Sequence, residues 1–182
     1  MVNNLGHLMI DLETLGSKSN SVILSIGAVE FNLDTGETGR TFYQNISIQS
    51  CLDHGLKIEG ENVLWWFTQS DAARLALATD IKPLGESLYL FRKFIETLGI
   101  DNLMVWGNGS RFDLGVLHDA YSAVKSQQVP WQFRNERDVR THIMDHLDIK
   151  DNTIREGVEH NALDDCLHQI KYCCAVRKIK NI

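Results

Sequence analysis

The chain has 182 residues, with 18 Lys and Arg against 24 Asp and Glu, which gives a formal net charge of −6. This length is typical of one domain, and we expect residues 1–182 to form a single domain. A hydrophobic content of 43% and a charged content of 23% exclude a disordered chain. The negative charge argues against a protein that holds nucleic acid mainly by general attraction to phosphate, although acidic groups can still act locally.

The four cysteines and the N-terminal residues are typical of a cytoplasmic protein. No CxxC pair occurs, which argues against a zinc ribbon or a thioredoxin motif and favours buried, reduced thiols. The first residues lack a positive region and a long apolar run, so we expect no signal peptide. No window approaches 18 apolar residues, so we expect no membrane-spanning helix and a cytoplasmic protein.

The first part of the chain predicts an antiparallel meander. Apolar and β-branched residues predict strands at 7–11, 22–31 and 41–48, and the sequence DTGE at 34–37 is a turn signal between the last two. Two long strands joined by a tight turn form a hairpin.

Helical patterns dominate the remainder. The apolar spacing predicts helices over 61–70, 71–78, 84–98, 112–124, 138–147 and 162–179. The apolar run LMVW at 103–106 fits a buried parallel strand, and a further short segment lies near 132–134. The predicted fold is therefore α/β, with a mixed five-stranded sheet made of the meander plus parallel strands and flanked by helices.

Two acidic residues lie at the end of the first strand. Asp11 and Glu13 are two apart, so their side chains point to the same side of the strand. Two carboxylates there repel each other unless a cation lies between them, and Mg²⁺ prefers oxygen ligands. A solvated pair at a strand end explains these two residues equally well.

Further acids occur after the apolar strand and at the start of the last helix. Asp113 lies in the first turn of its helix, outside the carboxyl end of a strand where α/β sheets bind ligands. Asp164 and Asp165 open the last helix, and His160 precedes them. Each acid also has a simpler explanation, a favourable interaction with the helix dipole. Four carboxylates and a histidine together suit two-metal phosphoryl chemistry, with ions roughly 3.5–4 Å apart.

Three segments resemble the three motifs of the DEDDh, or DnaQ-like, 3′–5′ exonucleases: DLET at 11–14, NGSRFD at 108–113 and HNALDD at 160–165. They occur in the order of that family and extend over nearly the whole chain. The pair Trp65-Trp66 and the sequence RDVRT at 137–141 are similar to a small single-domain branch of phage and prophage exodeoxyribonuclease VIII-like proteins and a mycobacterial exoribonuclease. The resemblance implies the ribonuclease H-like fold.

The resemblance also implies roles for individual residues. Two Mg²⁺ or Mn²⁺ ions are expected on Asp11, Glu13, Asp113 and Asp165. The family pattern makes the second acid of the pair the ligand, so Asp164 is expected to support the site or to cap the helix. His160 is the implied general base, and Asn161 stands where the sister DEDDy subclass has a tyrosine.

The implied reaction is hydrolysis of the 3′-terminal phosphodiester of single-stranded DNA or RNA, which releases nucleoside 5′-monophosphates one at a time. The expected substrate-binding residues are Thr14, Leu15, Trp66 and Asn108. Trp65 and Trp66 cannot share one helix face, so we expect one in the core and one at the cleft.

Several properties are left open by the sequence. DNA and RNA are not distinguished, because that choice depends on contacts to the 2′-hydroxyl. Dimers are frequent in related enzymes, so a homodimer is a further expectation, and a bacterial or phage origin follows from the same resemblance. The basic residues between 134 and 140 alternate with acids, which favours a structural role over guidance of phosphates. The alternative function is a non-catalytic ribonuclease H-like module that binds nucleic acid or protein.

Overall fold

A six-stranded mixed sheet forms the middle layer of the protein, in the order β4-β3-β2-β1-β5-β6. The computed structural model describes residues 5–99, 101–124 and 128–180. The strands are β1 (His7–Thr14), β2 (Ile23–Phe31), β3 (Thr38–Ile46), β4 (Ile81–Lys82), β5 (Met104–Gly107) and β6 (Glu136–Asp138). β1, β2 and β3 pair antiparallel, whereas β5 runs parallel to β1 and β6 parallel to β5. This arrangement confirms the predicted meander followed by parallel strands.

Two details of the predicted sheet are wrong. The sheet has a sixth strand, the two-residue β4, which pairs parallel with the end of β3. The third strand ends at Ile46 rather than at residue 48, because the chain turns there into a short helix whose N-cap is Ser47. The short segment near 132–134 lies largely in a 3₁₀ helix (Phe133–Asn135), and β6 follows it.

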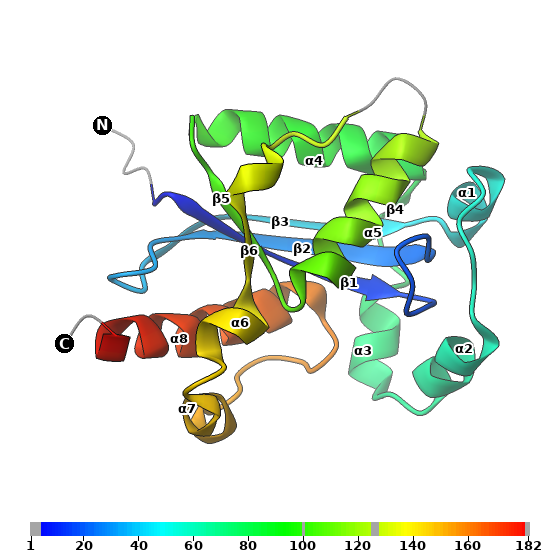
Figure 1. Cartoon of the computed structure of the whole chain (residues 1–182). Helices are drawn as coiled ribbons and strands as arrows, with labels where there is room; N and C mark the ends of the chain where they lie inside the picture. The colour runs from blue at the N-terminus through cyan, green and yellow to red at the C-terminus, as the bar shows by residue number, and fades with distance from the viewer. Residues whose placement is uncertain (1–4, 100, 125–127, 181–182) are drawn as a thin grey trace.

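Helices cover both faces of the sheet (Figure 1). They are α1 (Ile48–Asp53), α2 (Gly60–Phe67), α3 (Asp71–Ala76), α4 (Leu84–Leu98), α5 (Ser110–Ala123), α6 (Val139–Ile143), α7 (Leu147–Asn152) and α8 (Ala162–Lys180). α4 and α5 lie on one face, and α8 with α6 lies on the other. No helix in the described part of the chain has the length and apolar character needed to cross a bilayer.

The side-chain alternation of β1 divides the core into two layers. Leu8, Ile10 and Leu12 pack in the cluster under α4 and α5, whereas Met9 packs in the cluster under α8. Because successive strand residues point to opposite faces, Asp11 lies on the same face as Met9. The next residues of that face are acids, so the α8 side of β1 changes from apolar to acidic at its carboxyl end.

The start of α8 lies very close to the centre of the sheet. A Cβ added at Gly27 on β2 would lie 2.4 Å from the backbone carbon of Ala162, the first residue of α8. Glycine is therefore required at this crossing by close approach. The contact places the first turn of α8 directly against the sheet, next to the end of β1.

Candidate active site

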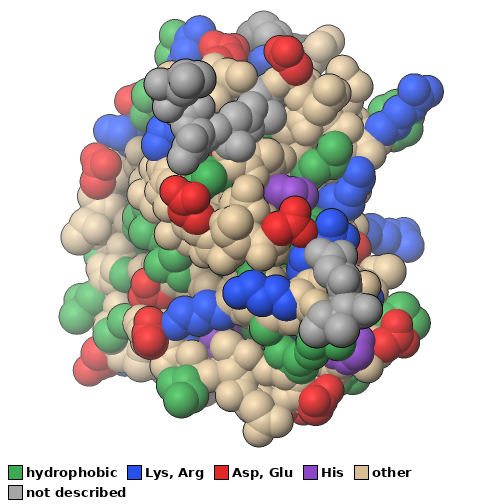
Figure 2. Space-filling model, turned by 90° about the vertical axis from the view of Figure 1, so that its left-hand side faces the viewer, with side chains coloured by type: hydrophobic (Ala, Val, Ile, Leu, Met, Phe, Trp, Pro, Cys, Tyr) green, Lys and Arg blue, Asp and Glu red, His purple; other side chains and the backbone are tan. Residues whose placement is uncertain are grey.

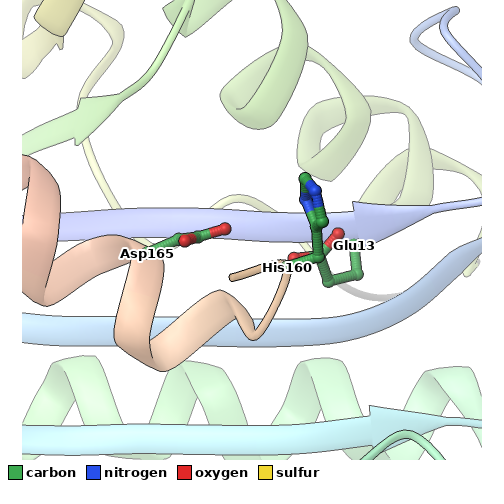
Figure 3. Close-up of side chains that lie close together, drawn as sticks. All are labelled: Glu13, His160 and Asp165. Carbon is green, nitrogen blue, oxygen red and sulfur yellow. The ribbon is translucent and has the colours of Figure 1, made fainter. Parts of the chain in front are cut away.

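Three of the predicted residues meet at the carboxyl end of β1. One ligand atom from each of Glu13, His160 and Asp165 lies within 4.8 Å of those from the other two. Figure 3 shows the Asp165 carboxylate extending from the first turn of α8 toward Glu13 on β1, with His160 on the loop that leads into that helix. Segments about 150 residues apart in the chain are thus joined in one cluster.

Asp11 and Asp113 belong to the same electrostatic unit. Burial raises the pKa of Asp11 well above its usual range, and the negative charges of Asp113, Glu13 and Asp165 raise it further. Burial, followed by the charges of Asp165 and Asp113, raises the pKa of Glu13 from its usual 4.5 to about 8. Burial and proximity therefore disfavour the simultaneous ionisation of Asp11, Glu13 and Asp113 without added positive charge.

The turn between β5 and α5 positions Asp113. This residue is 3% exposed, and burial raises its pKa from 3.8 to about 7, although hydrogen bonds with the backbone of Leu12 and Asn108 oppose that change. Asp138, at the end of β6, accepts hydrogen bonds from the backbone N–H of Ser110 and Thr141. One carboxylate therefore ties the start of α5 to the start of α6.

The loop before α8 holds His160 in an uncommon conformation. Its φ is +63°, in the left-handed region that non-glycine residues rarely adopt. The edge-to-face contact with Trp65 has a ring-centroid distance of 4.8 Å. Asn161 accepts hydrogen bonds from the backbone N–H of Leu163 and Asp164 and so caps the helix. Strained residues of this kind cluster at functional sites.

Asp164 contacts the loop before α8, and its expected role, to support the site or to cap the helix, stays a prediction. Its carboxylate accepts a hydrogen bond from the backbone N–H of Val158 over 2.7 Å. It thereby braces the loop that carries His160, and it leaves Asp165 as the acid that faces Glu13.

Two polar residues of the site were not predicted. The Gln169 amide donates a 2.7 Å hydrogen bond to Asp11, and the Arg155 guanidinium forms an ion pair with Asp165. Gln169 lies four residues after Asp165 on α8, so helical spacing places both on one face and could have revealed it. Arg155 lies in the loop before α8, where the sequence has no periodicity that could predict which way a side chain points.

The four predicted substrate-binding residues lie around the site. Thr14 and Leu15 are buried directly after Glu13, and Asn108 is half-buried between β5 and α5. Trp66 is 5% exposed, and its Nε1 donates a 2.9 Å hydrogen bond to the Thr14 carbonyl oxygen. Trp65 is 42% exposed, so it is the tryptophan at the surface. The role of all four residues in substrate binding stays a prediction.

The residues present fit a divalent cation. Within the described chain, one oxygen of Glu13 (Oε1) and one of Asp113 (Oδ2) are buried without a hydrogen-bond partner. Buried carboxylate oxygens of this kind are costly unless a cation or a donor satisfies them. Oxygen donors with one imidazole match Mg²⁺ or Mn²⁺ better than a soft metal.

A family model for the Rv2179c-like 3′–5′ exoribonuclease domain matches residues 6–177. The chain belongs to this family. The match confirms the predicted 3′–5′ exonuclease, a nuclease and hydrolase, over a module that only binds. The choice between DNA and RNA is not decided by it.

Similar proteins agree with this assignment. An exodeoxyribonuclease of Enterobacteria phage T4 is 25% identical over 193 residues, which cover 89% of this chain and 85% of the phage protein. The nuclease domain of 3′hExo, a DEDDh family member solved with bound rAMP, has a TM-score of 0.65 and 14% identity, with coverage of 96% of this chain and 92% of that one. The zinc-bound E. coli ExoI–ssDNA complex has a TM-score of 0.59 and 13% identity, and this chain spans 39% of it. The structural likeness confirms the predicted ribonuclease H-like fold.

Proposed function

We propose that the protein is a DEDDh-type exonuclease that uses two divalent ions, Mg²⁺ or Mn²⁺. The ions would be held by Asp11, Glu13, Asp113 and Asp165. The single observation that carries this proposal is a group of buried carboxyls, among them Glu13 and Asp113 with one oxygen each that is unpaired among the described residues, whose raised pKa values a bound divalent charge would relieve. The cluster of Glu13, His160 and Asp165 supports one such position.

Bound divalent ions would supply charge stabilisation for the attacking and leaving oxygens of the phosphodiester. The protein residues would orient those ions and move the proton. His160 would accept the proton of the attacking water, since a base must reach that water directly. Its place on the loop next to Glu13 and Asp165 supports this role.

We propose single-stranded DNA or RNA 3′ ends as the substrate. A solved relative is an E. coli ExoI–ssDNA complex, and another concerns 3′-end specific recognition of a histone mRNA stem-loop. On the face drawn in Figure 2, acidic and basic side chains are interspersed, so that side of the molecule carries no broad basic surface for phosphate. Together with the formal net charge of −6, this supports a local hold on the 3′ end rather than wide attraction to phosphate.

Further properties belong to the same proposal. Residues 1–182 would form one exonuclease domain, which the shared central sheet supports. A cytoplasmic enzyme of bacterial or phage origin is supported by the phage relative and by four buried, unpaired cysteines. A homodimer is testable by the mass of the protein in solution.

The decisive experiment offers matched DNA and RNA oligonucleotides, labelled at the 5′ or the 3′ end, with Mg²⁺ or Mn²⁺. We expect immediate release of the 3′ label as a mononucleotide and a ladder of shortening 5′-labelled strands. EDTA and the isosteric variant Asp113→Asn should each abolish release. If wild-type protein with either ion released no mononucleotide, or if the 5′ label were released first, the proposal would be wrong.

A further inference from the structure

A groove with a volume of about 690 Å³ lies beside the candidate active site. Its walls are the loop of residues 17–20, which follows β1, and the start of α5. Lys18, Arg111 and Arg140 line it, and Asp119 is the acid among its lining residues. We call it the cationic groove. An excess of cations in one depression is notable in a chain whose net charge is −6.

The arginines of the cationic groove are available to a ligand. Both Arg111 and Arg140 are exposed, and neither has an ion-pair partner among the described residues. The interaction of Arg140 with Asn108 is a long hydrogen bond of 3.5 Å. Lys18 is instead paired with Glu59 over 2.7 Å. Free guanidinium groups match the oxygens of a phosphodiester in pairs.

The cationic groove adjoins the active site, because Phe112, one of its lining residues, directly precedes Asp113. Arg111 lies two residues before Asp113 in the first turn of α5, and the 17–20 loop begins four residues after Glu13. The Arg140 guanidinium lies against the turn that leads into α5, since a Cβ built at Gly109 would be 3.3 Å from its Cζ. If the 3′-terminal nucleotide of a substrate occupied the carboxylate cluster, the nucleotides upstream of it would therefore extend along these cations.

We propose that the cationic groove binds backbone phosphates of the substrate strand upstream of its 3′ end, through Arg111 and Arg140. The ligand is the phosphodiester backbone, which carries no sequence information. The side chains of Ser19 and Asn20 add neutral donors on the opposite wall, whereas the Ser17 hydroxyl already donates to Glu59. This inference rests on the proposed exonuclease function and extends it to the nucleotides behind the scissile bond.

The test compares wild-type protein with the double variant Arg111→Gln/Arg140→Gln on two single-stranded substrates, a dinucleotide and an oligonucleotide long enough to cross the groove. Hydrogen bonds to charged groups are worth roughly tenfold each in affinity. We therefore expect kcat/KM on the longer substrate to fall at least tenfold more than kcat/KM on the dinucleotide. The salt dependence of binding to the longer strand, measured in Ca²⁺, should become shallower by about 1.4 in log–log slope, because each single-strand contact contributes about 0.7.

The control is Lys178→Gln/Lys180→Gln, which removes the same charge at the end of α8, on the side of the molecule where the chain terminates (Figure 1). It should keep both activities and the wild-type slope. Equal losses on both substrates, no loss on either, or a loss seen only with the dinucleotide would each overturn the assignment to the upstream strand. Should the double variant fail to fold, the exposed single variant Arg111→Gln gives the same comparison with about half the slope change. Absence of mononucleotide release by wild-type protein would instead refute the proposed function.

Discussion

His160 combines an unfavourable backbone conformation with a close aromatic neighbour. A φ of +63° costs free energy of about 1 kcal/mol or more in a non-glycine residue, and the surrounding structure must compensate for it. The Asn161 cap and the hydrogen bond of Asp164 to Val158 fix the backbone on either side. The Trp65 ring packs against the His160 imidazole and restricts its movement on one side. The loop thus holds the ring at a set position beside Glu13.

The variant His160→Asn should separate a proton acceptor from a metal ligand. Loss of a general base lowers kcat roughly 10²- to 10⁴-fold, while Mn²⁺ affinity should stay close to that of wild type. Steady-state kinetics and a Mn²⁺ titration check both quantities. The matched control is His54→Asn, since His54 lies at the end of α1. A large fall in Mn²⁺ affinity would show that His160 is a ligand instead.

Removal of the Gln169 amide should weaken metal binding. Gln169→Leu deletes the hydrogen bond that holds the Asp11 carboxylate, and loss of such a partner costs roughly 10- to 100-fold in metal affinity or activity. The exposed Gln49, which bonds Asp53 on α1, offers the control Gln49→Leu. Equal Mn²⁺ affinity in Gln169→Leu and wild type would contradict this role.

At the scale of elements, the crossing of β2 and α8 determines where Asp165 lies. Gly27→Ala would drive a methyl group into the Ala162 backbone, so α8 must move away from the sheet. We expect a loss of about 1–3 kcal/mol in the free energy of unfolding, measured in urea, together with reduced activity. Gly60→Ala is the control, because a Cβ there meets nothing within 4 Å. Equal stability of the two variants would show that α8 is not held by this contact.

Some elements were predictable because their own residues specify them. The predicted helix 84–98 has the bounds of α4, since its apolar stripe is buried and Gly99 ends it with a φ of +65°. The predicted helix 138–147 is wrong beyond Ile143, because Met144 and Leu147 are exposed and a second helix begins at Leu147. β4 has two residues, too few for an alternation pattern, and pairing with β3 defines it.

The residues of the candidate site were predictable where they belong to a sequence motif. Glu13, His160 and Asp165 were expected together from two motifs far apart in the chain, and they do meet. The ion pair of Arg155 with Asp165 depends instead on the path of the loop before α8. The basic residues between 134 and 140 were expected to be structural, yet Arg140 reaches the cationic groove, because the Asp138 hydrogen bonds bring α6 against the start of α5.

At the scale of the whole molecule, the acidic site should make stability depend on pH and on metal. In the folded protein the pKa of Glu13 is raised from 4.5 to about 8 and that of Asp113 from 3.8 to about 7. The folded state therefore binds protons that the unfolded chain releases. The stability from this linkage is present below the unfolded pKa values and is lost as the pH rises through about 7 to 8.

We therefore expect the Tm of metal-free protein to fall between about pH 6.5 and about pH 8, and Mg²⁺ to raise it more at the upper end. Below about pH 6.5, His7 acts in the opposite direction, because burial lowers its pKa to about 4. Thermal melts of wild type and Glu13→Gln, with and without Mg²⁺, isolate the contribution of the Glu13 carboxyl to the pH dependence of Tm. A wild-type Tm that rises over this window without metal, or the same slope in Glu13→Gln, would contradict the account.

The central claim is metal-dependent attack of water on the 3′-terminal phosphodiester. Digestion of one oligonucleotide in ¹⁸O-labelled water, followed by mass spectrometry, tests it most directly. The account predicts nucleoside 5′-monophosphates that appear in order from the 3′ end, each with a single ¹⁸O in its phosphate, and none in EDTA. Products with 3′-phosphates, internal fragments, or release that persists in EDTA would contradict it.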